Sequence, residues 1–137
     1  MIDESKFFEA AQALAQSLSQ WALLIIGGSL VTIVSTSYYR PESRRVRSAY
    51  LLFLPTWFLL AFSIYEGIRV QRAYVGYLVA ARLHSAQTIE NIAKTMEDAT
   101  RQQIQWLQLA LLFLGAWLLI YIAWWIFSAQ TTEKSKE

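Results

Sequence analysis

No charged side chain occurs between positions 107 and 127, and this run limits the possible fold more than any other feature of the sequence. A helix of that length rises about 30 Å at 1.5 Å per residue, which matches the hydrocarbon thickness of a bilayer. Trp106 precedes the run, and Trp124 and Trp125 lie at its far end, as is typical of aromatic side chains at the headgroup level. Residues 106–127 are therefore predicted to form a transmembrane helix.

Two further apolar blocks, residues 21–39 and 48–65, are also long enough to cross a bilayer as helices. The second block contains Pro55, which is expected to kink the helix or to act as a hinge in it. Hydrophobic residues make up 55% of the 137-residue chain, and they are concentrated in these blocks. The pattern predicts an all-α integral membrane protein with three transmembrane helices.

Residues 1–20 have the period of an amphipathic helix. Apolar side chains recur at three- and four-residue spacing, at Phe7, Ala11, Leu14, Leu18 and Trp21. Because neither glycine nor proline separates this segment from the first span, the helix is expected either to lie in the membrane plane or to continue directly into that span.

The polar segment 85–105 is predicted to be a long extramembrane helix between the second and third spans. Its inward-facing positions alternate at three- and four-residue spacing, the pattern of a coiled-coil seam, at Ile89, Ile92, Met96, Ala99, Gln103 and Trp106. Glu90 precedes Lys94 at the i,i+4 spacing that supports a helix. The other segments are a basic loop at 40–47, an interfacial segment or helical extension at 66–84, and a polar tail at 128–137.

The distribution of basic residues suggests an orientation. Lysines and arginines are equally frequent on the two sides of the predicted spans, but the loop 40–47 holds four arginines within eight residues. Dense positive charge in a short loop favours the cytoplasmic side. The expected orientation therefore places the N-terminus outside and the C-terminus in the cytoplasm, in a plasma or inner membrane. The net charge of +2 does not suggest nucleic-acid binding.

Small and polar residues form a stripe on the first predicted span. Gly28, Thr32 and Thr36 follow one another at four-residue spacing, and Ser29 lies in the adjoining row. Small residues at this spacing let two helix backbones approach closely, with hydroxyls bonding across the contact. Helix packing is the main interpretation of the stripe. The alternative is that its hydroxyls line a water-filled path in an oligomer.

Three charged residues, Glu66, Arg69 and Arg72, share one helical face directly after the second span. If that span ends at residue 65, they lie at the membrane edge, where the two arginines would anchor to lipid phosphates. If the helix instead runs deeper through residues 73–81, Glu66 becomes an intramembrane acid, which is a functional candidate by default.

The residue content argues against most catalytic and metal sites. The chain has no cysteine and a single histidine, His84, and that histidine has no motif around it. No cofactor, metal ion or enzymatic activity is therefore expected. Trp117 lies near the middle of the third span, where helix packing accounts for it more simply than a pigment or quinone pocket does.

Three transmembrane helices alone enclose little interior, so the chain is expected to assemble with other subunits. The favoured hypothesis is a homo-oligomeric pore or ion channel that is lined by the first span. The alternative is a non-conducting accessory or scaffold subunit of a larger membrane complex. The expected partners are the lipid bilayer and either further copies of the chain or other membrane subunits.

Overall fold

The computed structural model describes residues 4–36, 44–83 and 86–134, and these are helical apart from a turn at Leu83. Helix α1 spans Glu4–Thr36, and a short helix α2, Arg44–Ser48, leads into the 3-10 helix η2, Ala49–Leu52. Helix α3 spans Phe53–Arg82, and helix α4 spans Ala86–Lys134. Three helical stretches are long and apolar enough to cross a membrane, which confirms the all-helical expectation with three candidate spans.

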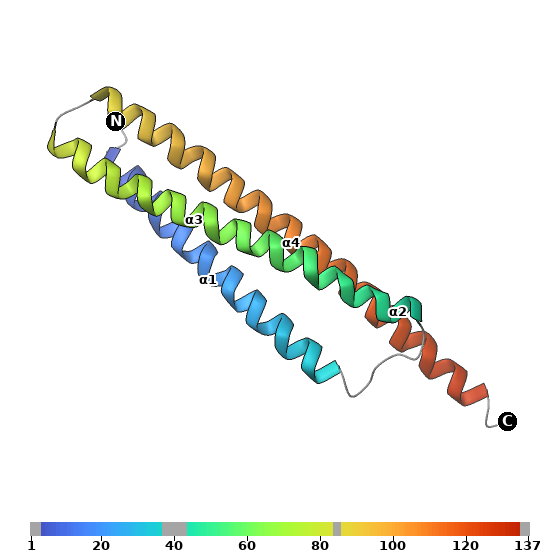
Figure 1. Ribbon diagram of the computed structural model, residues 1–137. Coiled ribbons are helices and arrows are strands. Elements are labelled where there is room, and N and C mark those ends of the chain that lie inside the picture. The colour runs from blue at the N-terminus through green and yellow to red at the C-terminus, as the bar shows by residue number, and fades with distance from the viewer. Residues whose placement is uncertain (1–3, 37–43, 84–85, 135–137) are drawn as a thin grey trace.

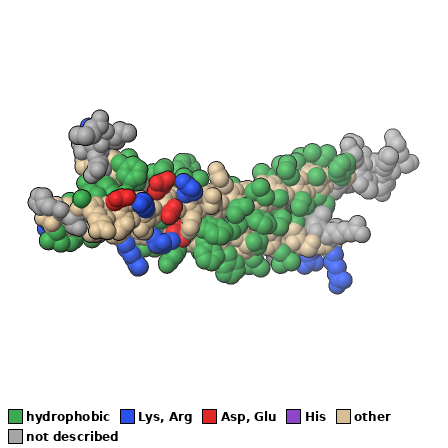
Figure 2. Space-filling view, turned by 90° about the horizontal axis from the view of Figure 1, so that it is seen from above, with side chains coloured by type: hydrophobic (Ala, Val, Ile, Leu, Met, Phe, Trp, Pro, Cys, Tyr) green, Lys and Arg blue, Asp and Glu red, His purple; other side chains and the backbone are tan. Residues whose placement is uncertain are grey.

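The three long helices lie side by side in an elongated bundle, with α1 and α4 running in one direction and α3 in the other (Figure 1). Each continues without a break from an apolar block into a polar segment. The described residues of the segments 1–20, 66–84 and 85–105, apart from Leu83, therefore belong to the long helices. On the face shown in Figure 2, acidic and basic side chains gather over one half of the bundle, and apolar side chains dominate the other half, with further basic side chains at its end. We call the part formed by residues 4–20, 66–82 and 86–102 the charged half, and the part formed by residues 21–36, 49–65 and 103–127 the uncharged half.

The other expected segments are covered only in part. Residues 44–47 of the basic loop belong to α2, whereas residues 40–43 lie outside the described residues. The predicted polar tail is helical as far as Lys134, where α4 ends. His84 also lies outside the described part of the chain.

The core positions of α3 alternate at three- and four-residue spacing. The six positions that follow this repeat are Phe53, Thr56, Leu60, Ser63, Gly67 and Val70, and Glu66 and Ala80 are buried outside it. This repeat is typical of helices that pack in a left-handed bundle with knobs-into-holes contacts. Three of the six side chains are small or polar, so the core of this helix is not uniformly apolar.

The seam predicted for residues 85–105 is confirmed as far as Gln103, since Met96, Ala99 and Gln103 are fully buried. The next buried position is Leu107 rather than the predicted Trp106. Two consecutive four-residue steps rotate the buried face at this point, which locally unwinds the supercoil. The Trp106 ring instead packs beside Phe62 of α3, with ring centroids 5.6 Å apart.

The buried face of α1 differs by one residue from the face that the sequence pattern indicated. Phe8, Ala15 and Ala22 are buried, whereas Phe7, Leu14 and Trp21 are 43%, 44% and 59% exposed. The small alanines allow the α1 backbone to approach two neighbouring helices at once, and the bulky side chains flank that contact. Ala11 and Leu18 of the predicted face are partly buried and pack against the core, so the prediction was right for these two positions and wrong for Phe7, Leu14 and Trp21.

Pro55 is the third residue of α3, which follows η2 without a break, and it lies inside the candidate span Ala49–Arg82. A proline is tolerated in a first turn because its missing N–H costs little there. Thr56 follows it, and its hydroxyl donates a 2.8 Å hydrogen bond to the carbonyl of Leu52. The change from 3-10 to α geometry thus lies just before this proline.

Trp117 is 4% exposed and closes the end of the bundle that lies near α2 and η2. Its ring centroid lies 4.7 Å from that of Phe53 and 5.5 Å from that of Tyr121. Ala49 of η2 completes the cluster. These contacts give Trp117 a packing role within the chain.

Candidate functional site

A buried polar layer joins the three long helices where the charged half of the bundle meets the uncharged half. Gln103 of α4 is fully buried, and its amide Nε2 donates to the carbonyl of Ala15 at 3.0 Å and to Oγ of Ser19 at 3.1 Å. Ser63 of α3 donates through Oγ to the Gln103 carbonyl at 3.1 Å. One glutamine thus links α4 to α1 through its side chain and to α3 through its backbone.

Gly67 of α3 completes this layer by leaving room for it. A Cβ atom at this position would collide with Oγ of Ser19 and would lie 2.7 Å from Nε2 of Gln103. Gln103 Oε1 and the Thr100 hydroxyl are buried without a hydrogen-bond partner in the described chain. A polar side chain at a core position fixes the register between helices, because other registers leave more of its atoms unpaired.

Glu66 is the first charged residue after the second apolar block, and it is turned into the bundle. Its side chain is 8% exposed, and Oε2 accepts a 2.9 Å bond from Nη1 of Arg69, whose side chain is 40% exposed. Arg72 is exposed and has no acidic partner among the residues that the structure describes. The structure therefore brings together two of the three charged residues that the sequence grouped. It also shows that α3 continues through residues 73–81, where Tyr74 and Tyr77 pack with the polar segment of α4, so the continuation by itself does not make Glu66 an intramembrane acid.

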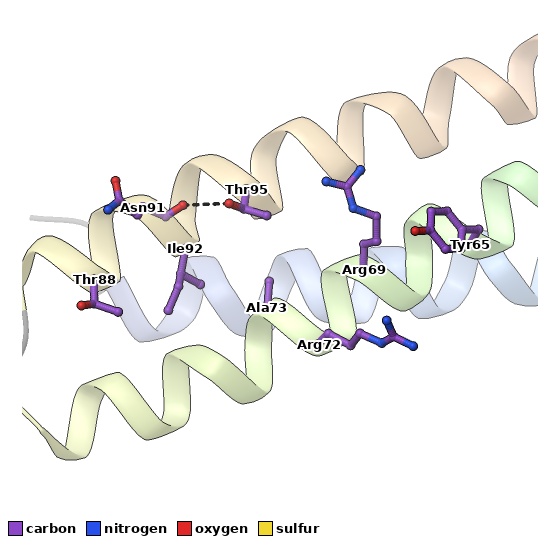
Figure 3. Close-up of a pocket in the computed structure, with 8 residues that line it drawn as sticks. All are labelled: Tyr65, Arg69, Arg72, Ala73, Thr88, Asn91, Ile92 and Thr95. Atoms are coloured by element: carbon purple, nitrogen blue, oxygen red, sulfur yellow. Dashed lines mark hydrogen bonds between the residues drawn. The ribbon is translucent and has the colours of Figure 1, made fainter.

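A groove of about 480 Å³ lies between α3 and α4 beside this ion pair (Figure 3). Arg69 reaches across it toward α4, and Arg72 points back along α3 in the direction of Tyr65 (Figure 3). Polar side chains of α4 form the opposite wall, at Thr88, Asn91 and Thr95. No acidic side chain is part of the described lining.

The small-residue stripe of α1 is divided between two environments. Ser29 is buried, accepts a 2.8 Å hydrogen bond from Nε1 of Trp57 in α3, and donates to the carbonyl of Ile26. Thr32 and Thr36 donate to carbonyls of their own helix, four residues earlier. A Cβ at Gly28 would meet no atom within 4 Å. Ser29 is thus the member of the stripe whose hydroxyl bonds to another helix.

The outer face of α4 carries two exposed ion pairs in the described charged half, Glu90–Lys94 and Glu97–Arg101. The first confirms the pair that the sequence indicated. The hydrogen bond that Lys94 donates, together with the charge of Lys94, lowers the pKa of the Glu90 carboxyl from its usual 4.5. The same bond and the charge of Glu90 raise the pKa of Lys94 from its usual 10.5. Exposed pairs of this kind contribute little to stability, so we read this face as solvated surface.

Sequence reasoning placed Gln103 on the seam but missed its partners Ser19, Ser63 and Gly67. Each of these residues is small and uncharged, and its neighbours in the sequence do not show whether it faces the core of the bundle. The three- and four-residue repeat along α3 could have marked residues 63 and 67 as core positions. Pairing them with residue 103 requires the alignment of two helices. Within the described residues, no group of three or more Asp, Glu or His side chains is placed to hold a metal ion.

No protein-family model, curated protein or solved structure is significantly similar to this chain. Its function is therefore inferred from the polar layer, the groove and the exposed apolar surface.

Proposed function

We propose that the uncharged half of the bundle crosses a lipid bilayer and that the charged half projects from it. Large apolar side chains are exposed along the uncharged parts of all three long helices, among them Leu23, Leu24, Val31, Val34, Phe58, Phe62, Leu112, Leu119 and Phe127. An apolar surface of this extent does not remain exposed on a soluble monomer. Charged residues bound this zone at both ends, at Glu66 on one side and Arg44 and Arg47 on the other.

The chain acts in this proposal as a non-conducting scaffold or accessory subunit of a larger membrane assembly. The observation that carries this choice is the buried Gln103, whose side chain bonds to α1 and whose backbone carbonyl accepts a bond from α3 at the centre of the bundle. The small-residue stripe is also a weaker candidate for the lining of a pore between chains, because the Ser29 hydroxyl already accepts a hydrogen bond from Trp57. A pore would have to be lined by Gly28, Thr32 and Thr36 of several copies.

Continuous helices suit a scaffold. Helix α4 has 49 residues and is about 73 Å long at 1.5 Å per residue, more than twice the hydrocarbon thickness of a bilayer. It therefore holds the projecting half at a fixed distance and rotation relative to the membrane half. The arginine-bearing end near α2 lies in the cytoplasm in this proposal, and the projecting bundle lies outside a plasma or inner membrane.

Reconstitution separates the scaffold from the pore. The protein is purified alone, its mass in detergent is measured by light scattering, and ion flux is followed in liposomes. We expect a monomer or small oligomer without flux. A discrete larger oligomer whose flux falls when Thr32 is replaced by leucine, but not when the buried Ser29 is replaced by alanine, would favour the pore and contradict the scaffold.

The membrane placement has its own test, because the chain has no native cysteine. A single cysteine at position 94 is expected to react with a water-soluble maleimide, and one at position 112 is expected to be protected. Labelling of intact cells at position 94 supports an external bundle. Labelling at this position only after lysis would reverse the orientation, and equal labelling at both positions would contradict the placement.

A further inference from the structure

We propose that the groove between α3 and α4 binds the phosphate of an anionic phospholipid with a hydroxylated headgroup. The inference rests on the membrane placement proposed above. It assigns a ligand class to a site that the scaffold function does not itself require.

Unbalanced positive charge is the first support. Arg69 and Arg72 line the groove, and no acidic side chain is part of the described lining. Glu66 accepts a bond from one of the five N–H groups of the Arg69 guanidinium, and Arg72 has no acidic partner in the described chain. Two guanidinium groups beside one buried carboxylate leave donors for an anion, and guanidinium–phosphate bonds are strong and directional.

The direction of α3 is the second support. Helical side chains lean toward the N-terminus of their own helix, and the N-terminal part of α3 is its uncharged part. Arg72 accordingly points back along α3 in the direction of Tyr65 (Figure 3). Tyr65 is 54% exposed at the start of the charged half, where the proposed headgroup level lies. Side chains of α3 thus reach toward the membrane edge, which is where lipid phosphates are found.

The opposite helix provides the contrast. Helix α4 runs the other way, so its basic side chains lean away from the proposed membrane. Arg101 follows this rule and donates at 3.1 Å to Glu97, which precedes it by one turn. The positive charge available at the membrane edge therefore comes from α3.

The size and far wall of the groove indicate the kind of headgroup. A volume of about 480 Å³ falls within the range of small-molecule sites and exceeds what a phosphate group alone would fill. On α4, Thr95 donates its hydroxyl proton to the carbonyl of Asn91, so its oxygen remains an acceptor, while the Asn91 amide offers donors. An acceptor and a donor beyond the arginines match the hydroxyls of a polyol headgroup such as glycerol.

Spin-labelled lipids test this assignment in vesicles of phosphatidylcholine. The full-length protein is reconstituted, and the immobilised fraction of labelled phosphatidylglycerol is compared with that of labelled phosphatidylcholine. We expect the wild type to prefer phosphatidylglycerol and Arg72→Gln to reduce the preference about fivefold, the effect of one arginine near an anionic lipid. The matched control is Arg82→Gln, which removes an exposed arginine of α3 outside the groove lining and is expected to leave the preference unchanged.

Each alternative result contradicts a specific step. An equal loss in Arg72→Gln and Arg82→Gln would show that net charge, and not the groove, attracts the lipid. Displacement of labelled phosphatidylglycerol by soluble glycerol phosphate would assign the groove to a soluble phosphate ligand and overturn the lipid. Immobilised lipid without any preference would refute the groove site alone. Absence of immobilised lipid of either kind would refute the membrane placement and this inference with it.

Discussion

Alanine at position 67 would place a methyl group where the structure already has two polar side chains. The new Cβ would collide with Oγ of Ser19 and would lie 2.7 Å from Nε2 of Gln103. Both atoms are at the ends of side chains, so they can move, but they can do so only by leaving the bonds that link α4 to α1. Gly67→Ala therefore tests whether the polar layer holds the bundle together.

The expected magnitude follows from three contributions. Alanine is favoured over glycine within a helix by about 1 kcal/mol. Displacing the Gln103 amide removes two hydrogen bonds and leaves a buried donor unsatisfied, which costs about 1–3 kcal/mol. Overpacking of a close contact costs a further 1–3 kcal/mol, roughly. With these values, Gly67→Ala should lower the free energy of unfolding by about 1–5 kcal/mol.

The assay is unfolding in mixed micelles by titration with a denaturing detergent, followed by near-ultraviolet circular dichroism of the tryptophans. Gly28→Ala and Gly115→Ala are the matched controls, because a Cβ at either position meets no atom within 4 Å. These variants should be neutral or more stable by up to about 1 kcal/mol. Adding Ser19→Ala to Gly67→Ala removes the nearest obstructing atom and should restore part of the loss. A Gly67→Ala protein as stable as the two controls would refute the close packing of this layer.

Three further predictions concern other contacts of the described chain. Trp57→Phe should lower the free energy of unfolding by about 1 kcal/mol through loss of the hydrogen bond to Ser29. A double-mutant cycle with Ser29→Ala should show coupling between the two positions, and additive effects would contradict the bond. Gln103→Met should change the free energy of unfolding by less than about 1 kcal/mol, because it removes the unpaired Oε1 together with the two hydrogen bonds that the amide donates. A loss above about 3 kcal/mol would contradict this reasoning. An NMR titration should find the pKa of Glu90 below 4.5 and should find it higher in Lys94→Gln. Because the pKa is lowered in the folded state, the stabilisation from this pair is complete above pH 4.5 and is lost as the pH falls through the lowered pKa. An unchanged pKa in the variant would show that the pair does not form in solution.

The apolar blocks were readable from the sequence because uncharged runs of that length have few alternatives to a membrane helix. The polar core could not be predicted from the sequence in the same way. Ser63 and Gly67 look like ordinary residues at the end of one block, and their role depends on the Gln103 amide that reaches this level from another helix. A sequence pattern defines the faces of one helix, whereas a buried hydrogen bond requires the alignment of two.

The inward face of α1 was missed for a related reason. Hydrophobic periodicity selected Phe7, Ala11, Leu14, Leu18 and Trp21, and of these only Ala11 and Leu18 pack against the core. A helix that packs closely on two neighbours buries its small residues, and here these are Ala15 and Ala22. In α3, Glu66 is buried and Arg72 is exposed although both stand on the face that the spacing defined, so spacing alone did not distinguish their environments.

The bond from Gln103 to Ala15 joins positions that are 88 residues apart, and this separation has a consequence for biosynthesis. Residues of α1 are synthesised long before their partners on α4, so the polar layer cannot form until most of the chain has left the ribosome. Until then, Ala15 and Ser19 have no partner helix to complete their contacts. Insertion of the individual helices must therefore precede their association, as in two-stage folding of membrane proteins. In the proposed membrane placement, a chain truncated before residue 103 would insert its first two helices without the glutamine through which both of them bond to α4.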